Sequence, residues 1–248
     1  MRHEPIQVLQ AASRGVPAPV ARPDLLIAGA SGVLGNEVLR RLLGSQRFGT
    51  LQVTVREPMQ AGLRGVHALL VEGDAPAAWP AVAAQVGVIL FEPPRLFHDR
   101  ERALWTPLPQ QLGATAAWMR RSGVVTLAVV LPHAQGRLPE ALKRGLAGLD
   151  EQAVAALGFE RLLIIRSASK PSAAPAAHAL PRLAQWMLSV LSFMVPSSEQ
   201  PVRAAKVAEL VGVALELAPP GIHVGAPELV WRAAQGSARD VAAQWLAR

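Results

Sequence analysis

The sequence of 248 residues contains no cysteine and no tyrosine, and these two absences restrict its chemistry. Without cysteine the chain has no disulfide, no thiolate nucleophile and no zinc–thiolate site. Without tyrosine it has no phenol to pass a proton during catalysis. The six histidines do not follow a metal-ligand spacing, so we expect no metal.

Aromatic residues are scarce, at 4% of the chain, and the positive charge is dispersed. The net charge is +7, yet the basic residues form no long run and no ladder interleaved with aromatic residues. Nucleic-acid binding is therefore not indicated. A basic surface would equally suit an anionic cofactor.

No segment is apolar enough to cross a membrane. Residues 1–23 lack the apolar core of a signal peptide, and we expect a flexible N-terminal arm there. The most apolar window, residues 183–195, is too short to span a bilayer. We expect a buried helix that lines a pocket or a subunit contact there, the alternative being a helix on a membrane surface. These features predict a cytoplasmic protein.

The most informative segment is residues 25–35, Leu-Leu-Ile-Ala-Gly-Ala-Ser-Gly-Val-Leu-Gly. A short apolar strand leads into a glycine turn, and apolar residues at helical spacing follow. This order of strand, turn and helix is typical of a site for a dinucleotide pyrophosphate, because the helix start presents free N–H groups to an anion. The alternative is a tight turn that binds nothing. The predicted cofactor contacts in the turn are Gly29, Ser31, Gly32, Val33, Leu34 and Gly35.

The next predicted strand, residues 51–55, ends in Arg56, about 20 residues beyond the glycine turn, where a partner for the adenosine ribose is expected. A guanidinium can bind a 2′-phosphate but cannot accept a hydrogen bond from a ribose hydroxyl. We therefore expect NADP(H) rather than NAD(H). The alternative is that Arg56 is a solvated charge and Glu57 holds the ribose.

Strands and helices alternate along the chain, and this alternation predicts an α/β fold built on a doubly wound parallel sheet. We expect residues 24–166 to form the NADP-binding core and residues 167–248 a small, mostly helical C-terminal lobe that completes the same domain. The remaining expected strands are residues 66–71, 86–91, 124–131, 161–166 and 222–224. The expected helices after the first are residues 77–85, 109–122, 139–157 and 201–217, with further helices at the C-terminus.

Several segments resemble the atypical short-chain dehydrogenases/reductases, close to the NmrA-like and Tat-interacting-protein-like groups. The resemblance extends over about residues 24–235 and implies a Rossmann fold. The matching segments are residues 25–35, Val-Thr-Val-Arg-Glu-Pro (53–58), Val-Glu-Gly-Asp (71–74), Ala-Leu-Gly-Phe-Glu-Arg-Leu-Leu-Ile-Ile-Arg (156–166) and Gln-Pro-Val-Arg-Ala-Ala-Lys-Val-Ala-Glu-Leu-Val (200–211).

The resemblance also implies roles for individual residues. Asp74 would contact the adenine and Arg56 the 2′-phosphate. The loop after Phe91, with Pro93, would pass the ribose on the nicotinamide side. Ser167 would lie in the loop after the sixth strand, near the nicotinamide.

The chain departs from this family in its catalytic residues. The family's reductases use a Ser and a Tyr-x-x-x-Lys pair, in which the lysine lowers the pKa of the tyrosine. Family spacing puts Lys143 at the tyrosine position, Ala147 at the lysine position and Leu131-Pro132-His133 near the serine position. A slip of one helical turn would give Lys143 the lysine role, with Pro139 in place of the tyrosine.

The catalytic residues are therefore unknown. His133 and Lys143 are the candidates nearest the expected nicotinamide edge, and Glu92 and His98 are weaker ones. We expect an NADP(H)-binding protein that is a weak or inactive reductase and acts as a sensor or partner-binding protein. The alternative is an NADPH-dependent oxidoreductase of a small carbonyl with a non-standard proton donor. The sequence identifies neither the substrate nor the protein partner, and it allows a homo-oligomer.

Overall fold

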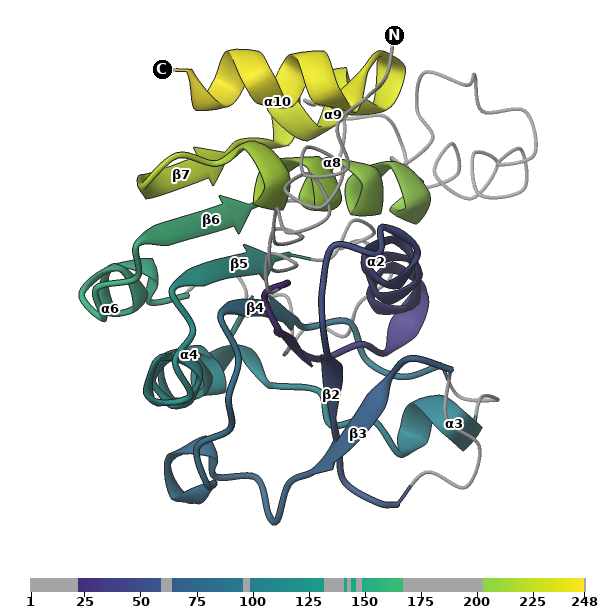
Figure 1. The fold of residues 1–248 in the computed structure, drawn as a ribbon, viewed down its shortest axis with the longest axis vertical. Coiled ribbons are helices and arrows are strands. Elements are labelled where there is room, and N and C mark those ends of the chain that lie inside the picture. The colour runs from purple at the N-terminus through teal and green to yellow at the C-terminus, as the bar shows by residue number, and fades with distance from the viewer. Residues whose placement is uncertain are drawn as a thin grey trace, which may run out of the picture.

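The computed structural model describes residues 22–58, 64–95, 99–131, 141, 144–145, 149–166 and 203–247. Seven strands in this part of the chain form one sheet, and every neighbouring pair is parallel (Figure 1). Their order across the sheet is β3-β2-β1-β4-β5-β6-β7. The strands are β1 (Leu25–Ala28), β2 (Leu51–Val55), β3 (His67–Leu70), β4 (Val86–Leu90), β5 (Thr126–Val130), β6 (Arg161–Ile165) and β7 (Gly221–Gly225).

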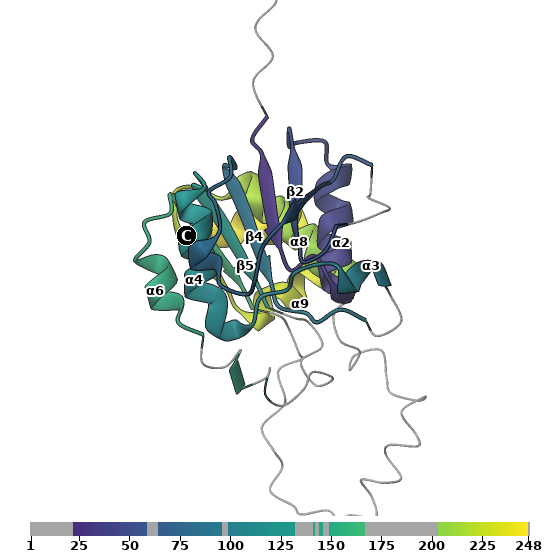
Figure 2. The same ribbon diagram turned by 90° about the horizontal axis from the view of Figure 1, so that it is seen from below.

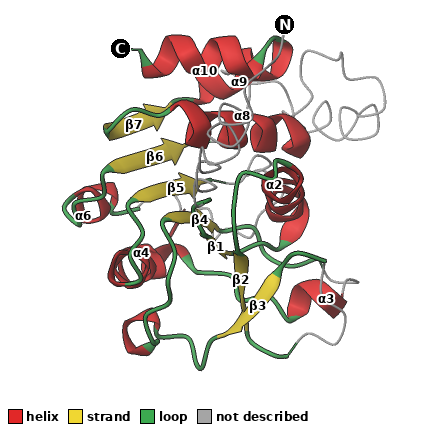
Figure 3. Cartoon of the chain, in the orientation of Figure 1, coloured by secondary structure: helices red, strands yellow, loops and turns green. Residues whose placement is uncertain are grey.

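Helices cover both faces of this sheet, as Figures 2 and 3 show. The described helices are α2 (Gly32–Gly44), α3 (Asp99–Arg102), α4 (Leu112–Arg121), α6 (Glu151–Ala155), α8 (Ala204–Leu217), α9 (Pro227–Gln235) and α10 (Ala238–Leu246). Two short 3₁₀ turns are η1 (Pro76–Ala78) and η2 (Pro109–Gln111).

The strands bury both faces because their side chains alternate between two apolar clusters. In β1, Leu25 and Ile27 pack in the cluster that includes α2 and α8. Leu26 and Ala28 pack in the cluster on the opposite face, which includes α4. The short apolar run at residues 25–28 is therefore a central strand with no exposed face.

The strand order reverses between β1 and β4, which are neighbours in the sheet. From β1 the chain proceeds outward to β2 and β3, and then returns to β4 and proceeds to the other edge. This is the doubly wound, Rossmann-like arrangement, in which ligands bind at the carboxyl ends of the strands beside the reversal. The predicted fold class is confirmed.

Residues 203–247 join the same structure. Helix α8 packs against α2, and β7 pairs in parallel with β6. Helix α10 in turn packs on α8 and α9. The expected N-terminal arm, apart from Arg22 and Pro23, and the apolar window at 183–195 lie outside the described residues. Among the helices that the structure describes, none is long and apolar enough to span a membrane.

Two expected helices differ from the structure. In place of a helix at 77–85 there is only the 3₁₀ turn η1, because Pro80 has no N–H to continue a helix and its ring would clash with the preceding turn. Within the expected helix 139–157, the separate helix α6 begins after Asp150, whose side chain accepts a hydrogen bond from the N–H of Ala153 at 2.8 Å. Helix α3 was not expected from the sequence.

Replacing Gly35 with alanine should reduce the free energy of unfolding by about 1–3 kcal/mol, the usual cost of overpacking. A Cβ there would lie 2.6 Å from the carbonyl carbon of Ala30 and 2.7 Å from the oxygen of Gly29, both main-chain atoms. Urea denaturation measures the change. The matched control is Gly113→Ala in α4, where a Cβ would meet nothing within 4 Å and stability should hold or rise. Equal effects at both positions would contradict the packing argument.

Candidate functional site

The glycine turn between β1 and α2 lies at the carboxyl edge, where the strand order reverses. Gly29 and Gly32 have φ values of 86° and 71°, in the left-handed region that favours glycine. A Cβ on Gly29 would also lie 2.0 Å from the carbonyl oxygen of Leu90 at the end of β4. The turn therefore has the backbone of an anion-binding turn, with the first N–H groups of α2 at the sheet edge.

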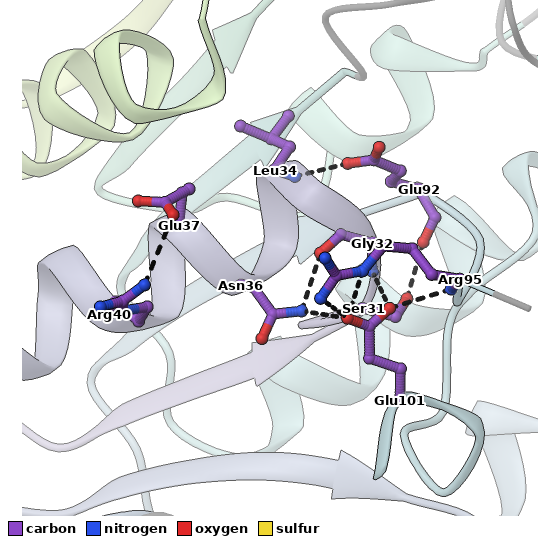
Figure 4. Close-up of polar contacts among 9 residues, drawn as sticks. All are labelled: Ser31, Gly32, Leu34, Asn36, Glu37, Arg40, Glu92, Arg95 and Glu101. Atoms are coloured by element: carbon purple, nitrogen blue, oxygen red, sulfur yellow. Dashed lines mark hydrogen bonds and ion pairs between the residues drawn. The ribbon is translucent and has the colours of Figure 1, made fainter. Parts of the chain in front are cut away.

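Two glutamates from the connection between β4 and α4 occupy the start of α2 (Figure 4). The N–H of Gly32 donates to Oε2 of Glu101 at 3.1 Å. The N–H of Leu34 donates to Oε2 of Glu92 at 2.6 Å. Carboxylates at this position stabilise a helix because they satisfy its free N–H groups and the positive end of its dipole.

Glu101 is held by an extensive set of donors. Its side chain is only 4% exposed. Besides Gly32, it accepts hydrogen bonds from the Nδ2 of Asn36 at 2.8 Å and from the N–H of Arg95 at 2.9 Å. The Arg95 guanidinium adds a contact from Nε at 2.7 Å and an ion pair through Nη2. Burial alone would raise the pKa of Glu101, but the hydrogen bonds from Arg95 and Gly32 outweigh it and lower the pKa.

Ser31 precedes α2 at the position where a serine usually caps a helix, but its side chain is directed elsewhere. Ser31 is fully buried, its hydroxyl donates to the carbonyl oxygen of Glu92 at 2.6 Å, and it shares a second hydrogen bond with Thr106 at 2.6 Å. The two glutamates therefore cap α2 in place of Ser31. Ser31 instead holds the β4–α4 connection against the turn through its two hydrogen bonds.

The residues assigned to the adenosine end also contact one another. Asp74 follows β3, and its Oδ1 lies 3.4 Å from Nη2 of Arg56. The same Oδ1 accepts a hydrogen bond from Nε1 of Trp105 at 3.0 Å. Trp105 is fully buried and makes an edge-to-face contact with Trp79 at 4.7 Å between ring centroids. The structure thus places an indole N–H against the carboxylate that the family resemblance assigns to adenine.

The β4–α4 connection crosses the carboxyl ends of β1 and β2. The N–H of Trp105 donates to Thr54 in β2, and the N–H of Gly29 donates to the carbonyl oxygen of Trp105 at 3.2 Å. The N–H of Arg56 donates to Ala103 at 2.7 Å. In a doubly wound fold a dinucleotide lies across these same strand ends.

A small cavity remains beside this connection. It has a volume of about 210 Å³ and is lined by three of the predicted contacts, Arg56, Phe91 and Pro93. Arg102 and Leu104 also line it. Sites for drug-sized ligands usually measure 300–1,000 Å³. The cavity therefore suits a single charged or planar group and not a whole dinucleotide.

The main chain of the glycine turn fits NADP(H), but the side chains around it do not fit the cofactor in this conformation. The glycine turn and the first turn of α2 have the backbone that a pyrophosphate requires. In this conformation, however, Glu101 and Glu92 already accept hydrogen bonds from the N–H groups of Gly32 and Leu34, and Asp74 is already bonded to Trp105.

Of the other predicted site residues, some lie in the described part of the chain and others lie outside it. Val33 is 43% exposed on α2, while Gly35 is buried in the packing of the turn. Ser167, His133, Lys143 and His98 lie outside the described residues. Sequence reasoning missed Glu101, Arg95 and Trp105, which belong to no motif. The only hint in the sequence is that the first turn of α2 has no acidic residue of its own.

Among the described residues no group of three or more His, Asp or Glu side chains is arranged to hold a metal ion.

No protein-family model matches the chain, and no curated protein matches its sequence. Among solved structures, the chain is similar to a predicted epimerase from Bacteroides thetaiotaomicron, with 14% identity and a TM-score of 0.39, over 60% of this chain and 72% of the other. It is also similar to the protein gox2253, with 15% identity and a TM-score of 0.46, over 86% of this chain and 74% of the other.

Replacing Glu101 with glutamine should destabilise the fold by about 1.5–3 kcal/mol at neutral pH, the range for hydrogen bonds to charged groups. Because the folded-state pKa is lowered, the contribution is present above the ordinary value of 4.5 and is lost as the pH falls through the lowered pKa. The stability difference between wild type and variant should therefore shrink in acid. Urea denaturation between neutral pH and strong acid measures it, with the exposed Glu72→Gln as control. A constant difference across this range would contradict the assignment.

Proposed function

We propose that this protein binds NADP(H) at the carboxyl edge of its sheet and belongs to the atypical short-chain dehydrogenase/reductase type. The single observation that carries the proposal is the glycine turn at the strand reversal, where left-handed Gly29 and Gly32 bring the N–H groups of α2 to that edge. This is the geometry with which doubly wound folds bind a pyrophosphate. Residues 53–58, which include the end of β2, and residues 71–74, which follow β3, resemble the same family and lie at the same edge.

The preference for NADP(H) over NAD(H) depends on Arg56. Its side chain is 51% exposed at the end of β2 and lines the small cavity together with Arg102. An exposed guanidinium here is suited to a 2′-phosphate, with which it can form two parallel charge-assisted hydrogen bonds. The present partner of Arg56, Asp74, is itself 66% exposed, so their ion pair is weak and a phosphate could replace it.

The proposed role is binding and not ordinary carbonyl reduction. The whole chain contains no tyrosine, so the phenol that protonates the product in the family's reductases is missing. A protein that holds a nicotinamide cofactor without this apparatus can act as a redox sensor or bind a partner in a cofactor-dependent way. His133 and Lys143 are the candidate residues to replace the missing acid, and a bound water is the alternative donor.

Replacing Arg56 with alanine should weaken NADPH binding by about 1.5–3 kcal/mol, the range for a charge-assisted hydrogen bond. NADH binding should hardly change, because NADH has no 2′-phosphate. Isothermal titration calorimetry with both cofactors measures the difference. Arg64→Ala, which removes an exposed arginine before β3, is the control for net charge. Equal losses for NADPH and NADH would show that Arg56 has a structural role.

Ordinary aldehydes, ketones and quinones should give little or no NADPH oxidation. General acid catalysis contributes about 10²–10⁴-fold in rate, and its usual donor is absent. A spectrophotometric assay over a panel of carbonyl compounds tests this expectation. Any residual activity should fall in His133→Ala or Lys143→Ala. Fast turnover that persists in both variants would overturn the non-catalytic assignment.

A further inference from the structure

The place of the pyrophosphate is filled by the chain itself. The N–H groups of Gly32 and Leu34, which an incoming phosphate would need, donate to Glu101 and Glu92. Figure 4 shows the two carboxylates approaching the first turn of α2 from two sides. Because a helix start binds any suitably placed anion, these carboxylates and a pyrophosphate compete for the same donors.

The two glutamates differ in how firmly they are held. Glu101 is buried and accepts hydrogen bonds from Gly32, Asn36 and Arg95. Glu92 is partly exposed, and its carboxylate makes one described hydrogen bond, to the N–H of Leu34. Its main chain is fixed separately through the hydroxyl of Ser31. The Glu92 side chain can therefore leave the helix start without moving the connection that carries it.

The same β4–α4 connection also contacts the residues assigned to the adenosine end. The indole N–H of Trp105 meets Asp74, and the backbone of residues 103–105 lies over the ends of β1 and β2 through hydrogen bonds to Gly29, Thr54 and Arg56. A single segment thus supplies the indole that bonds to Asp74 and the carboxylates that cap α2.

We propose that the β4–α4 connection is a built-in competitor of the dinucleotide, and that Glu92 is the residue that sets the affinity of the site for a diphosphate. A pyrophosphate that entered with Glu92 in place would lie beside the negative charge of its carboxylate in a partly buried site, where repulsion is weakly screened. Binding therefore requires Glu92 to swing away. The inference rests on the proposed function but concerns only this chain's own residues.

The test uses the full chain with Glu92→Ala and Glu92→Gln. The glutamine variant removes the charge but keeps an oxygen that can accept from Leu34, so it guards against a folding defect. The probes are inorganic pyrophosphate, followed by thermal unfolding, and NADPH, followed by calorimetry. The control is Glu160→Ala, which removes the same charge from an exposed site before β6, at the opposite edge of the sheet.

Pyrophosphate should raise the melting temperature of both Glu92 variants by several degrees, and that of wild type and Glu160→Ala much less. NADPH should bind both Glu92 variants at least about tenfold more tightly than wild type. Stabilisation by pyrophosphate with no NADPH binding to any form would support the competitor and refute NADP(H) binding. Equal binding of NADPH and equal stabilisation by pyrophosphate in wild type and the Glu92 variants, or an equal gain in Glu160→Ala, would overturn the role of Glu92 and leave the proposed function standing.

Discussion

The site depends on the close approach of α2 to the ends of β1 and β4. Gly29 lies against the carbonyl oxygen of Leu90, and Gly35 lies against the main chain of Ala30, at distances that leave no room for a side chain. This packing fixes the start of α2 at the strand reversal and leaves its N–H groups directed at the sheet edge. Those groups need acceptors, and the chain supplies Glu101 and Glu92.

An internal acceptor has an advantage over a ligand that binds at the same place. It is tethered, so it loses no translational freedom when it binds the helix start. The advantage is greatest for Glu101, which is buried and bonded to Arg95 and Asn36. It is smaller for Glu92, which is partly exposed. In our proposal, an anionic ligand therefore competes with Glu92 and Glu101 for the N–H groups at the start of α2.

The capped start of α2 and the missing tyrosine affect two different steps, cofactor entry and proton transfer. Under the proposed function, the absence of a phenol would affect proton transfer to a product, whereas Glu92 and Glu101 would affect entry of the cofactor. In our proposal both features favour a protein whose output is binding, with cofactor occupancy coupled to movement of the Glu92 side chain. The small cavity lined by Arg56 and Arg102 then remains accessible to a charged group before the Glu92 side chain moves.

The sequence by itself determined the parallel sheet and the turn after β1, because apolar runs, glycine spacing and helical periodicity are local properties. Local patterns failed at residues 77–85, where Pro80 prevents the expected helix. The glutamate caps could not be predicted, since Glu101 and Gly32 are 69 positions apart and no motif links them. The same holds for Trp105 and Asp74, which are 31 positions apart. Only the tertiary structure decided which groups cap α2 and which group bonds to Asp74. The reason is that packing of the β4–α4 connection across the strand ends brings these distant groups into hydrogen-bond distance.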